Sequence, residues 1–229
     1  MKTIGIIGGL SWLSTEAYYR LVNEMINEKL GGVSSAKVIV YSVNFEEIKT
    51  LTFAGDWQGI SKIICSMAQK VEHAGADCLL IGANTMHKIA GEIQQAISIP
   101  LIHIAAETGK AIEKKGLSKI ALLGTKYTME LGFYQQQLEK HSISTIIPNE
   151  TDRHFIHDAI YNEMGKNIFL PATKQRFLSI IDSLVQEGAA GIILGCTEIP
   201  LLLNQQDCSV PVFDTTQIHA AAAVAYALE

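Results

Sequence analysis

The amino-acid sequence predicts an α/β protein built from two pseudo-symmetric lobes, each a doubly wound parallel sheet. Short runs of Val, Ile and Leu alternate with amphipathic stretches along the chain, as expected when strands buried on both faces alternate with helices. Three pairs of segments also repeat in the same order in the two halves. The length of 229 residues allows one to two domains at about 150 residues each.

The repeat divides the chain into two lobes. Its matched segments, at offsets of 113, 116 and 111, are residues 75–85 with 188–198, residues 4–9 with 120–125, and residues 99–102 with 210–213. The last expected helix follows the final strand of the second lobe and returns to the first. We therefore expect a first lobe of residues 1–104 plus 214–229 and a second lobe of residues 105–213.

The pattern of apolar residues predicts each element in turn. Strands are expected at residues 3–8, 37–42, 77–83 and 99–103, and again at 119–124, 143–147, 190–195 and 210–213. Helices are expected at residues 14–30, 59–74, 86–97, 105–115, 127–141, 153–165, 172–187 and 215–228. Gly75, Gly116 and Gly188 come directly after helical stretches, where a left-handed residue ends a helix.

Composition and absent motifs exclude several classes of function. With 18 Lys and Arg against 23 Asp and Glu and no basic cluster, the chain is not expected to bind nucleic acid or an anionic membrane. We expect no secretory signal and no membrane span. Four irregularly spaced cysteines indicate free thiols in the cytoplasm. Motifs for dinucleotides, P-loop nucleotides, zinc and serine hydrolysis are absent, so no cofactor or metal is required.

Small polar residues cluster where the strands are expected to end. These segments are residues 8–11, 42–44, 83–85, 124–126 and 196–198. In open α/β sheets ligands bind beyond the carboxyl ends of the strands, and helix N-termini there favour anions. The sequence therefore predicts an active site in the cleft between the lobes that suits a small carboxylic acid.

Cys196 is the most informative single residue. It follows the apolar run of residues 192–194 and precedes Thr197 and Glu198. A thiol at a helix N-terminus has a lowered pKa and can act as a nucleophile or base. The alternative is a small buried hydrophobic residue at a strand end. His87, at an expected helix start, either titrates in the cleft or is a polar cap.

A second polar cluster has a spacing that resembles a metal site. Its members are Asp152, His154, His157 and Asp158. The same stretch has an apolar side at residues 155–156 and 159–160, so we expect the cluster to be the solvated face of a helix.

Five groups of residues carry a family resemblance. They are IGIIGG with SW (residues 4–9 and 11–12), NTMH (84–87), LLGT with TM (122–125 and 128–129), GCTEIP (195–200) and PVFDTTQIH (211–219). In order and spacing they resemble the aspartate/glutamate racemase family, the cofactor-independent amino-acid racemases. The resemblance covers nearly the whole chain and agrees with the two-lobe repeat.

The resemblance implies a mechanism with two cysteine bases and without pyridoxal phosphate or metal. One thiolate removes the α-proton of a bound amino acid, and the opposite thiol returns a proton to the other face. The second-lobe cysteine is Cys196. The first-lobe cysteine should directly precede Asn84, where Ala83 stands instead, and the internal repeat also pairs Ala83 with Cys196.

Three explanations of Ala83 remain open. The Thr85 hydroxyl, or a water near it, substitutes for the missing thiol and gives an enzyme that favours one enantiomer. Alternatively, Ala83 is an engineered replacement for cysteine. In the third explanation the fold performs one-thiol chemistry, as in the arylmalonate decarboxylases, which this plan also resembles.

The main hypothesis is an isomerase, a racemase of aspartate or glutamate that uses Cys196. Expected substrate-binding residues are Gly9, Ser11, Asn84, Thr125, Thr197 and Glu198, with Lys49 and Lys166 for the side-chain carboxylate. The rival hypothesis is a non-catalytic protein that binds an amino acid. The resemblance also implies a homodimer, which the mean hydropathy of +0.21 favours.

Overall fold

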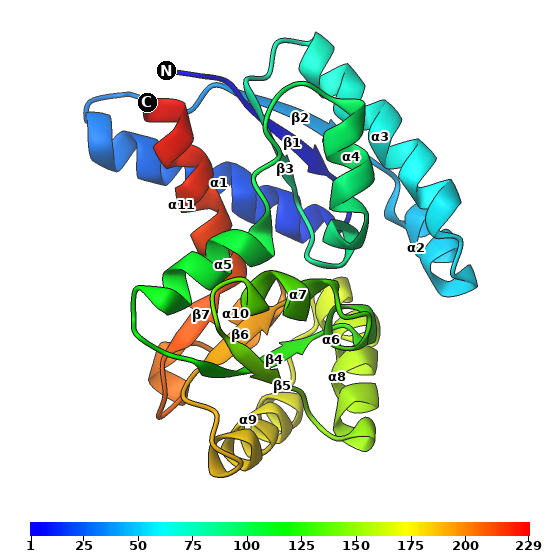
Figure 1. The fold of residues 1–229 in the computed structure, drawn as a ribbon, viewed down its shortest axis with the longest axis vertical. Helices are drawn as coiled ribbons and strands as arrows, with labels where there is room; N and C mark the ends of the chain where they lie inside the picture. Colours follow the sequence, from blue (N-terminus) through cyan, green and yellow to red (C-terminus); the bar gives the residue numbers. More distant parts are fainter. The chain divides into compact units, whose positions relative to one another are not determined.

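The computed structural model describes all 229 residues, and the chain divides into two compact units (Figure 1). Unit 1 contains residues 1–103 and 219–229, and unit 2 contains residues 104–218. Each unit holds one parallel sheet covered by helices. The predicted α/β fold with two parallel-sheet lobes is confirmed, whereas the expected domain boundaries stay a prediction.

The sheet of unit 1 has the order β2-β1-β3. Its strands are β1 (Ile4–Gly8), β2 (Val38–Ser42) and β3 (Cys78–Ile81), all parallel. The strand expected at residues 99–103 is wrong, because only Leu101 pairs, in an isolated bridge with Leu79. Two backbone hydrogen bonds form this bridge, from the N–H of Leu79 to the carbonyl of Pro100 and from the N–H of Ile102 to the carbonyl of Leu79. The ladder then stops, and a helix begins at Ile104.

Helices cover both faces of this sheet (Figure 1). On one face lie α1 (Trp12–Leu30) and the part of α11 (Thr215–Leu228) from His219 onward; α3 (Trp57–His73) and α4 (Ala90–Ala96) lie on the other. Because side chains alternate along a strand, Ile6 packs toward α1 and Ile7 toward α3. Unit 1 also contains η1 (Thr85–Ile89) and α2 (Phe45–Ala54), and the sequence analysis did not expect α2.

The sheet of unit 2 has the order β5-β4-β6-β7. Its strands are β4 (Lys119–Gly124), β5 (Ser144–Ile146), β6 (Ile192–Gly195) and β7 (Val212–Asp214), again all parallel. The register agrees with the sequence repeat: Leu79 lies opposite Leu101 in unit 1, and Ile192 lies opposite Val212 in unit 2. The two sheets therefore share one plan, in which β7 corresponds to the single bridge of unit 1.

Two pairs of helices pack on the sheet of unit 2. One face carries α5 (Ile104–Glu113) and α7 (Phe133–Glu139), and the other carries α8 (Glu150–Asn162) and α9 (Pro171–Gln186). Short helices complete the unit: α6 (Lys126–Glu130), η2 (Met164–Lys166), α10 (Ile199–Leu202) and η3 (Gln205–Asp207). The single helix expected at residues 127–141 is broken into α6 and α7, because Gly132 has a φ of 75°. No helix of the structure is long and apolar enough to cross a bilayer.

Two glycines bring the ends of β4 and β6 close together. Gly124 and Gly195 lie opposite each other in the ladder. A Cβ at Gly124 would lie 2.8 Å from the carbonyl oxygen of Gly195, and a Cβ at Gly195 would lie 2.7 Å from that of Leu123. Both positions therefore require glycine. The residue that directly follows each strand, Thr125 after β4 and Cys196 after β6, is a candidate site residue.

Candidate functional site

Polar side chains follow β4 and β6 at the carboxyl edge of the unit 2 sheet, as the sequence predicted. Thr125 is buried and is the N-cap of α6, where its Oγ1 accepts a hydrogen bond of 3.3 Å from the backbone N–H of Thr128. Cys196 follows β6 directly. Its partly buried thiol donates to Oε2 of Glu198 over 2.9 Å.

Glu198 holds two donors with one carboxylate oxygen. The hydroxyl of Thr197 donates to the same Oε2 atom over 2.8 Å, and the Glu198 side chain is almost entirely buried. A buried carboxylate accepts charge-assisted hydrogen bonds, which are roughly twice as strong as neutral ones. Cys196, Thr197 and Glu198 therefore form a fixed polar group at the end of β6.

The pKa of Cys196 is shifted opposite to the direction that the sequence predicted. Burial raises the pKa of the thiol well above its ordinary value, and the neighbouring Glu198 carboxylate raises it further. The backbone N–H groups of Thr197 and Glu198 lower this pKa, but by less. The helix that follows, α10, has only four residues, so its dipole does not offset burial and a negative neighbour. Cys196 therefore rests as a protonated thiol.

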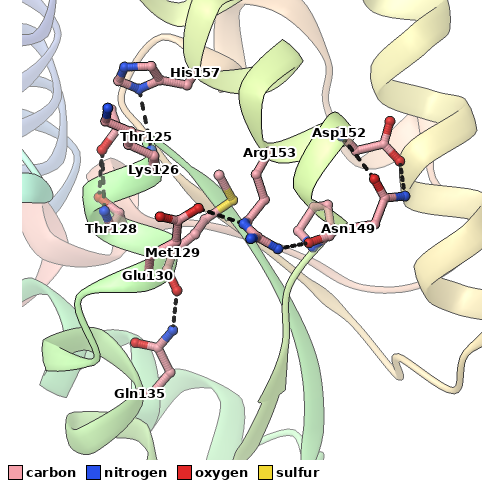
Figure 2. Close-up of polar contacts among 11 residues, drawn as sticks. Thr125, Lys126, Thr128, Met129, Glu130, Gln135, Asn149, Asp152, Arg153 and His157 are labelled. Atoms are coloured by element: carbon pink, nitrogen blue, oxygen red, sulfur yellow. Dashed lines mark hydrogen bonds and ion pairs between the residues drawn. The ribbon is translucent and has the colours of Figure 1, made fainter.

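Two aromatic residues of α8 belong to the same environment. Burial raises the pKa of Tyr161, and the charges of Cys196 and Glu198 raise it further. The ring of His157 lies 4.8 Å from that of Tyr161, and its Nδ1 accepts a hydrogen bond of 3.4 Å from the backbone N–H of Lys126 (Figure 2). The sequence analysis missed Tyr161 and named His157 only as part of a solvated cluster, although their spacing of four places them on one helix face.

The start of α8 is attached to α6 and α9 by polar contacts. Figure 2 shows Asn149 donating to Asp152 and Arg153 donating to Glu130. Arg176 of α9 also pairs with Asp152. The expected solvated face is therefore wrong for Asp152 and His157, which are both buried, because these contacts satisfy them inside unit 2.

The expected residues of unit 1 lie at the carboxyl ends of β1 and β3. Gly9 has a φ of 75° and its N–H donates to Oγ1 of Thr15 over 2.7 Å. Ser11 is the N-cap of α1. Asn84 and Thr85, which follow Ala83 after β3, are both buried.

His87 forms a buried cluster with two other histidines of unit 1. Its ring centroid lies 4.8 Å from that of His103 and 5.4 Å from that of His219. Nδ1 of His87 lies 2.9 Å from the carbonyl oxygen of Ala83, whereas Nε2 is buried without a hydrogen-bond partner. Burial, followed by the two neighbouring histidines, lowers the pKa of His87 well below its ordinary value. His87 is therefore a neutral, buried imidazole. The sequence analysis had expected either a titrating group in the cleft or a polar helix cap.

The two expected lysines lie on other elements of their units. Lys49 is on α2 and pairs with Glu46 at 3.1 Å, and Lys166 is an exposed residue of η2. A role for either in binding a side-chain carboxylate stays a prediction. No group of three or more His, Cys, Asp or Glu residues is arranged to hold a metal ion.

Comparison with known proteins gives consistent matches over nearly the whole chain. A family model described as Asp/Glu/Hydantoin racemase matches residues 7–223. The chain is 28% identical over 231 residues to the broad specificity amino-acid racemase RacX of Bacillus subtilis (strain 168), covering 96% of each protein.

Two solved structures are similar over their full lengths. A Yersinia pestis protein, assigned provisionally as an Asp/Glu racemase, is 49% identical with a TM-score of 0.93, and 100% of each chain is covered. An aspartate racemase homologue from Pyrococcus horikoshii OT3 is 35% identical with a TM-score of 0.87, again covering 100% of each chain.

Proposed function

Because the chain belongs to the Asp/Glu/Hydantoin racemase family, we propose that it is an amino-acid racemase that uses Cys196 to move the α-proton of aspartate or glutamate. Family membership supports an amino-acid racemase. The substrate, the role of the thiol and the consequence of Ala83 are parts of the proposal. Cofactor independence, a cytoplasmic location and a homodimer belong to it as well.

The hydrogen bond between Cys196 and Glu198 carries the proposal. A thiol that rests protonated has a proton to return to a carbanion, and the carboxylate bonded to it can accept that proton when a thiolate is needed. Proton transfer needs both the right protonation state and a positioned partner. In the exchange step the thiolate takes the α-proton, the Cα–H bond breaks, and its electron pair stays on the substrate as an enolate-like anion.

The negative charge that develops on the substrate carboxylate needs fixed donors. Thr125 and Thr197 follow β4 and β6 beside Cys196, and both are buried. Hydroxyl and backbone N–H groups held in place before the reaction stabilise such charge most effectively in a site with little water. We assign Thr125 and Thr197 to this role, and the expected part of Gly9, Ser11 and Asn84 in substrate binding stays a prediction.

Ala83 distinguishes this chain from a symmetric two-thiol enzyme. Its methyl group carries no exchangeable proton, and it stands at the position equivalent to Cys196 in the repeat. We propose that the hydroxyl of Thr85, two residues further on, takes this place either directly or through a water. A hydroxyl is a weaker acid than a thiol, so the enzyme would exchange the α-proton of one enantiomer faster than that of the other.

The names of the relatives guide the choice of substrate. One similar structure is described as an aspartate racemase homologue, and RacX is described as having broad specificity. We propose an acidic amino acid, with Lys49 and Lys166 as candidates for its side-chain carboxylate. A panel of the common amino acids in both enantiomeric forms tests this choice against broad specificity.

Proton NMR in heavy water tests the proposed function. The chain is incubated with L- and D-aspartate and with L- and D-glutamate, and loss of the α-proton signal is followed over time. The proposal predicts loss of the signal together with appearance of the opposite enantiomer on a chiral column. Binding without exchange of any amino acid would favour a binding protein, and release of carbon dioxide from arylmalonates would favour a one-thiol decarboxylase.

A further inference from the structure

The imidazole of His87 is buried with one nitrogen bonded and the other unused. Nδ1 lies 2.9 Å from the carbonyl oxygen of Ala83. A carbonyl oxygen can only accept, so Nδ1 must carry the hydrogen. In a neutral imidazole Nε2 is then an acceptor with a lone pair, and no hydrogen-bond donor reaches it. His87 is 2% exposed, so this acceptor is not open to bulk water.

The neighbouring His219 has a hydrogen-bond partner for each of its ring nitrogens. Its Nε2 lies 2.7 Å from the carbonyl oxygen of Ile102, which assigns the hydrogen to Nε2, and its Nδ1 accepts from the hydroxyl of Tyr18 over 2.7 Å. Burial lowers the pKa of His219 to about 3 and holds that of His87 well below its ordinary value. Both rings are therefore neutral. They carry the hydrogen on different nitrogens, and only His87 has an unused acceptor.

An unused acceptor selects the chemistry of the group that can bind it. A carboxylate has no hydrogen to donate and would be repelled by the lone pair. In an acidic amino acid at neutral pH both carboxylates are acceptors only, and the α-ammonium group is the donor. The unused nitrogen therefore suits the amino group of such a molecule and rejects its carboxylates.

We infer that Nε2 of His87 accepts a hydrogen bond from the α-ammonium group of the amino-acid substrate, an assignment that rests on the proposed function. The position of the residue supports the inference. His87 lies in η1, which follows β3 at the carboxyl edge of the sheet, where ligands bind in this class of fold. Its other nitrogen is bonded to Ala83, the position equivalent to Cys196. The tie to Ala83 would hold the ring in one orientation during binding.

Nitrogen-15 NMR of the histidine-labelled wild-type chain tests this directly. The Nε2 resonance of His87 is followed during titration with L-aspartate and L-glutamate, and then with succinate and glutarate, which lack the amino group. We expect the resonance to move toward a hydrogen-bonded value with the amino acids only. The two nitrogens of His219, both already bonded, serve as an internal control and should not move.

The His87→Asn variant separates the two nitrogens of the ring. The asparagine amide can replace Nδ1 as donor to Ala83, but it places no atom at the position of Nε2. We expect KM for the amino acid to rise about tenfold or more, as for a lost hydrogen bond to a charged group, with a smaller change in kcat. The inhibition constants of succinate and glutarate should stay unchanged, which a purely structural defect would not produce. His87→Gln, which can again offer an acceptor, should restore part of the affinity.

A matched control variant exists on α3. His73 also has Nδ1 bonded to a carbonyl oxygen four residues earlier, that of Gln69 at 2.6 Å, but it is exposed. His73→Asn should leave KM unchanged.

Several outcomes would overturn the inference. An Nε2 resonance that stays fixed while the amino acid binds, whether because a water alone occupies the site or because nothing does, would contradict it. Equal weakening of the amino acid and its deaminated analogue in His87→Asn would contradict it as well. If the wild-type chain exchanges no α-proton, the proposed function fails instead, and this result is recorded separately from the titration.

Discussion

The thiol of Cys196 donates a hydrogen bond of 2.9 Å to Oε2 of Glu198, two residues further along the chain. Burial of the thiol holds the sulfur in its protonated form, and this contact adds to the effect, because the carboxylate disfavours a second negative charge beside it. It also gives the proton a destination when the thiolate is required. The chemistry proposed for unit 2 depends on this pair.

Replacing Glu198 by Gln should lower the pKa of Cys196. The substitution removes the negative charge but keeps the shape of the side chain, so burial remains the main influence on the thiol. The pH dependence of alkylation of Cys196 by iodoacetamide, followed by mass spectrometry of the peptide that contains it, measures the change. Turnover should fall, since the acceptor of the thiol proton is lost. A pH profile identical to that of the wild-type chain would show that the carboxylate does not control the thiol.

Replacing Ala83 by Cys should speed the interconversion of enantiomers. The variant supplies the second thiol that a symmetric two-base cycle needs, so the initial rates from the L- and D-forms should become more nearly equal. Chiral chromatography measures both rates, and Ala83→Ser is the matched control because it adds a side chain of similar size with a less acidic hydroxyl. Unchanged rates in Ala83→Cys would mean that the missing thiol is not what limits turnover.

Replacing Arg176 by Met should destabilise the fold. Arg176 pairs with the buried carboxylate of Asp152, whose other side-chain contact is the amide of Asn149. Because Arg176 itself is partly exposed, we expect a loss of about 1–2 kcal/mol in the free energy of unfolding, less than for a fully buried pair. Urea unfolding measures it.

The exposed pair of Arg20 and Glu24 on α1 is the control for this experiment. Arg20→Met should cost no more than about 0.5 kcal/mol. Equal losses in the two arginine variants would show that burial of Asp152 adds nothing to the strength of its pair.

The stability of the protein should fall in acid because of its buried histidines. Burial lowers the pKa of His219 to about 3 and holds that of His87 well below its ordinary value, whereas in the unfolded chain both titrate near about 6.5. The stabilisation is therefore complete above about pH 6.5 and is lost as the pH falls toward the folded values. Each histidine contributes a slope of up to about 1.4 kcal/mol per pH unit in this range.

The His219→Gln variant should reduce the slope of the unfolding free energy against pH by the contribution of one histidine. Glutamine keeps a donor for the carbonyl of Ile102 but has no group that titrates, so the variant is less stable at neutral pH and loses less in acid. Urea unfolding at several pH values between 4 and 7, roughly the window set by these shifts, provides the measurement. His73→Gln, at an exposed position, is the matched control. A slope in His219→Gln equal to that of the wild-type chain would contradict a neutral, buried His219.

Much of the fold could be predicted because the repeat and the apolar runs both reflect the burial of parallel strands. A parallel strand buried on both faces must be apolar throughout, and this made β1, β4 and β6 visible in the sequence. The strand expected at residues 99–103 is reduced to a single bridge at Leu101. Its proline does not explain this, because Pro211 stands at the equivalent position before β7. Helix α2 was missed, although its N-cap Asn44 and its acidic first turn at Glu46 and Glu47 are typical of a helix start.

The place of the candidate residues in the fold was predictable from the sequence more than their surroundings were. The rule that ligands bind at strand ends selected Cys196 and Thr125 from residue order alone. The direction of the pKa shift at Cys196 depends on where the Glu198 side chain turns, which no sequence pattern encodes. The burial of His157 likewise depends on contacts between α8 and the turn after β4.

The measurement that tests the central claim most directly is α-proton exchange in heavy water by the Cys196→Ser variant. The account predicts that exchange falls by about 10²–10⁴-fold, the usual contribution of a positioned acid or base, while the circular dichroism spectrum and the thermal unfolding temperature stay close to wild type. Cys65→Ser, which changes another partly buried thiol, should retain full exchange. Exchange at the wild-type rate in Cys196→Ser would contradict the account.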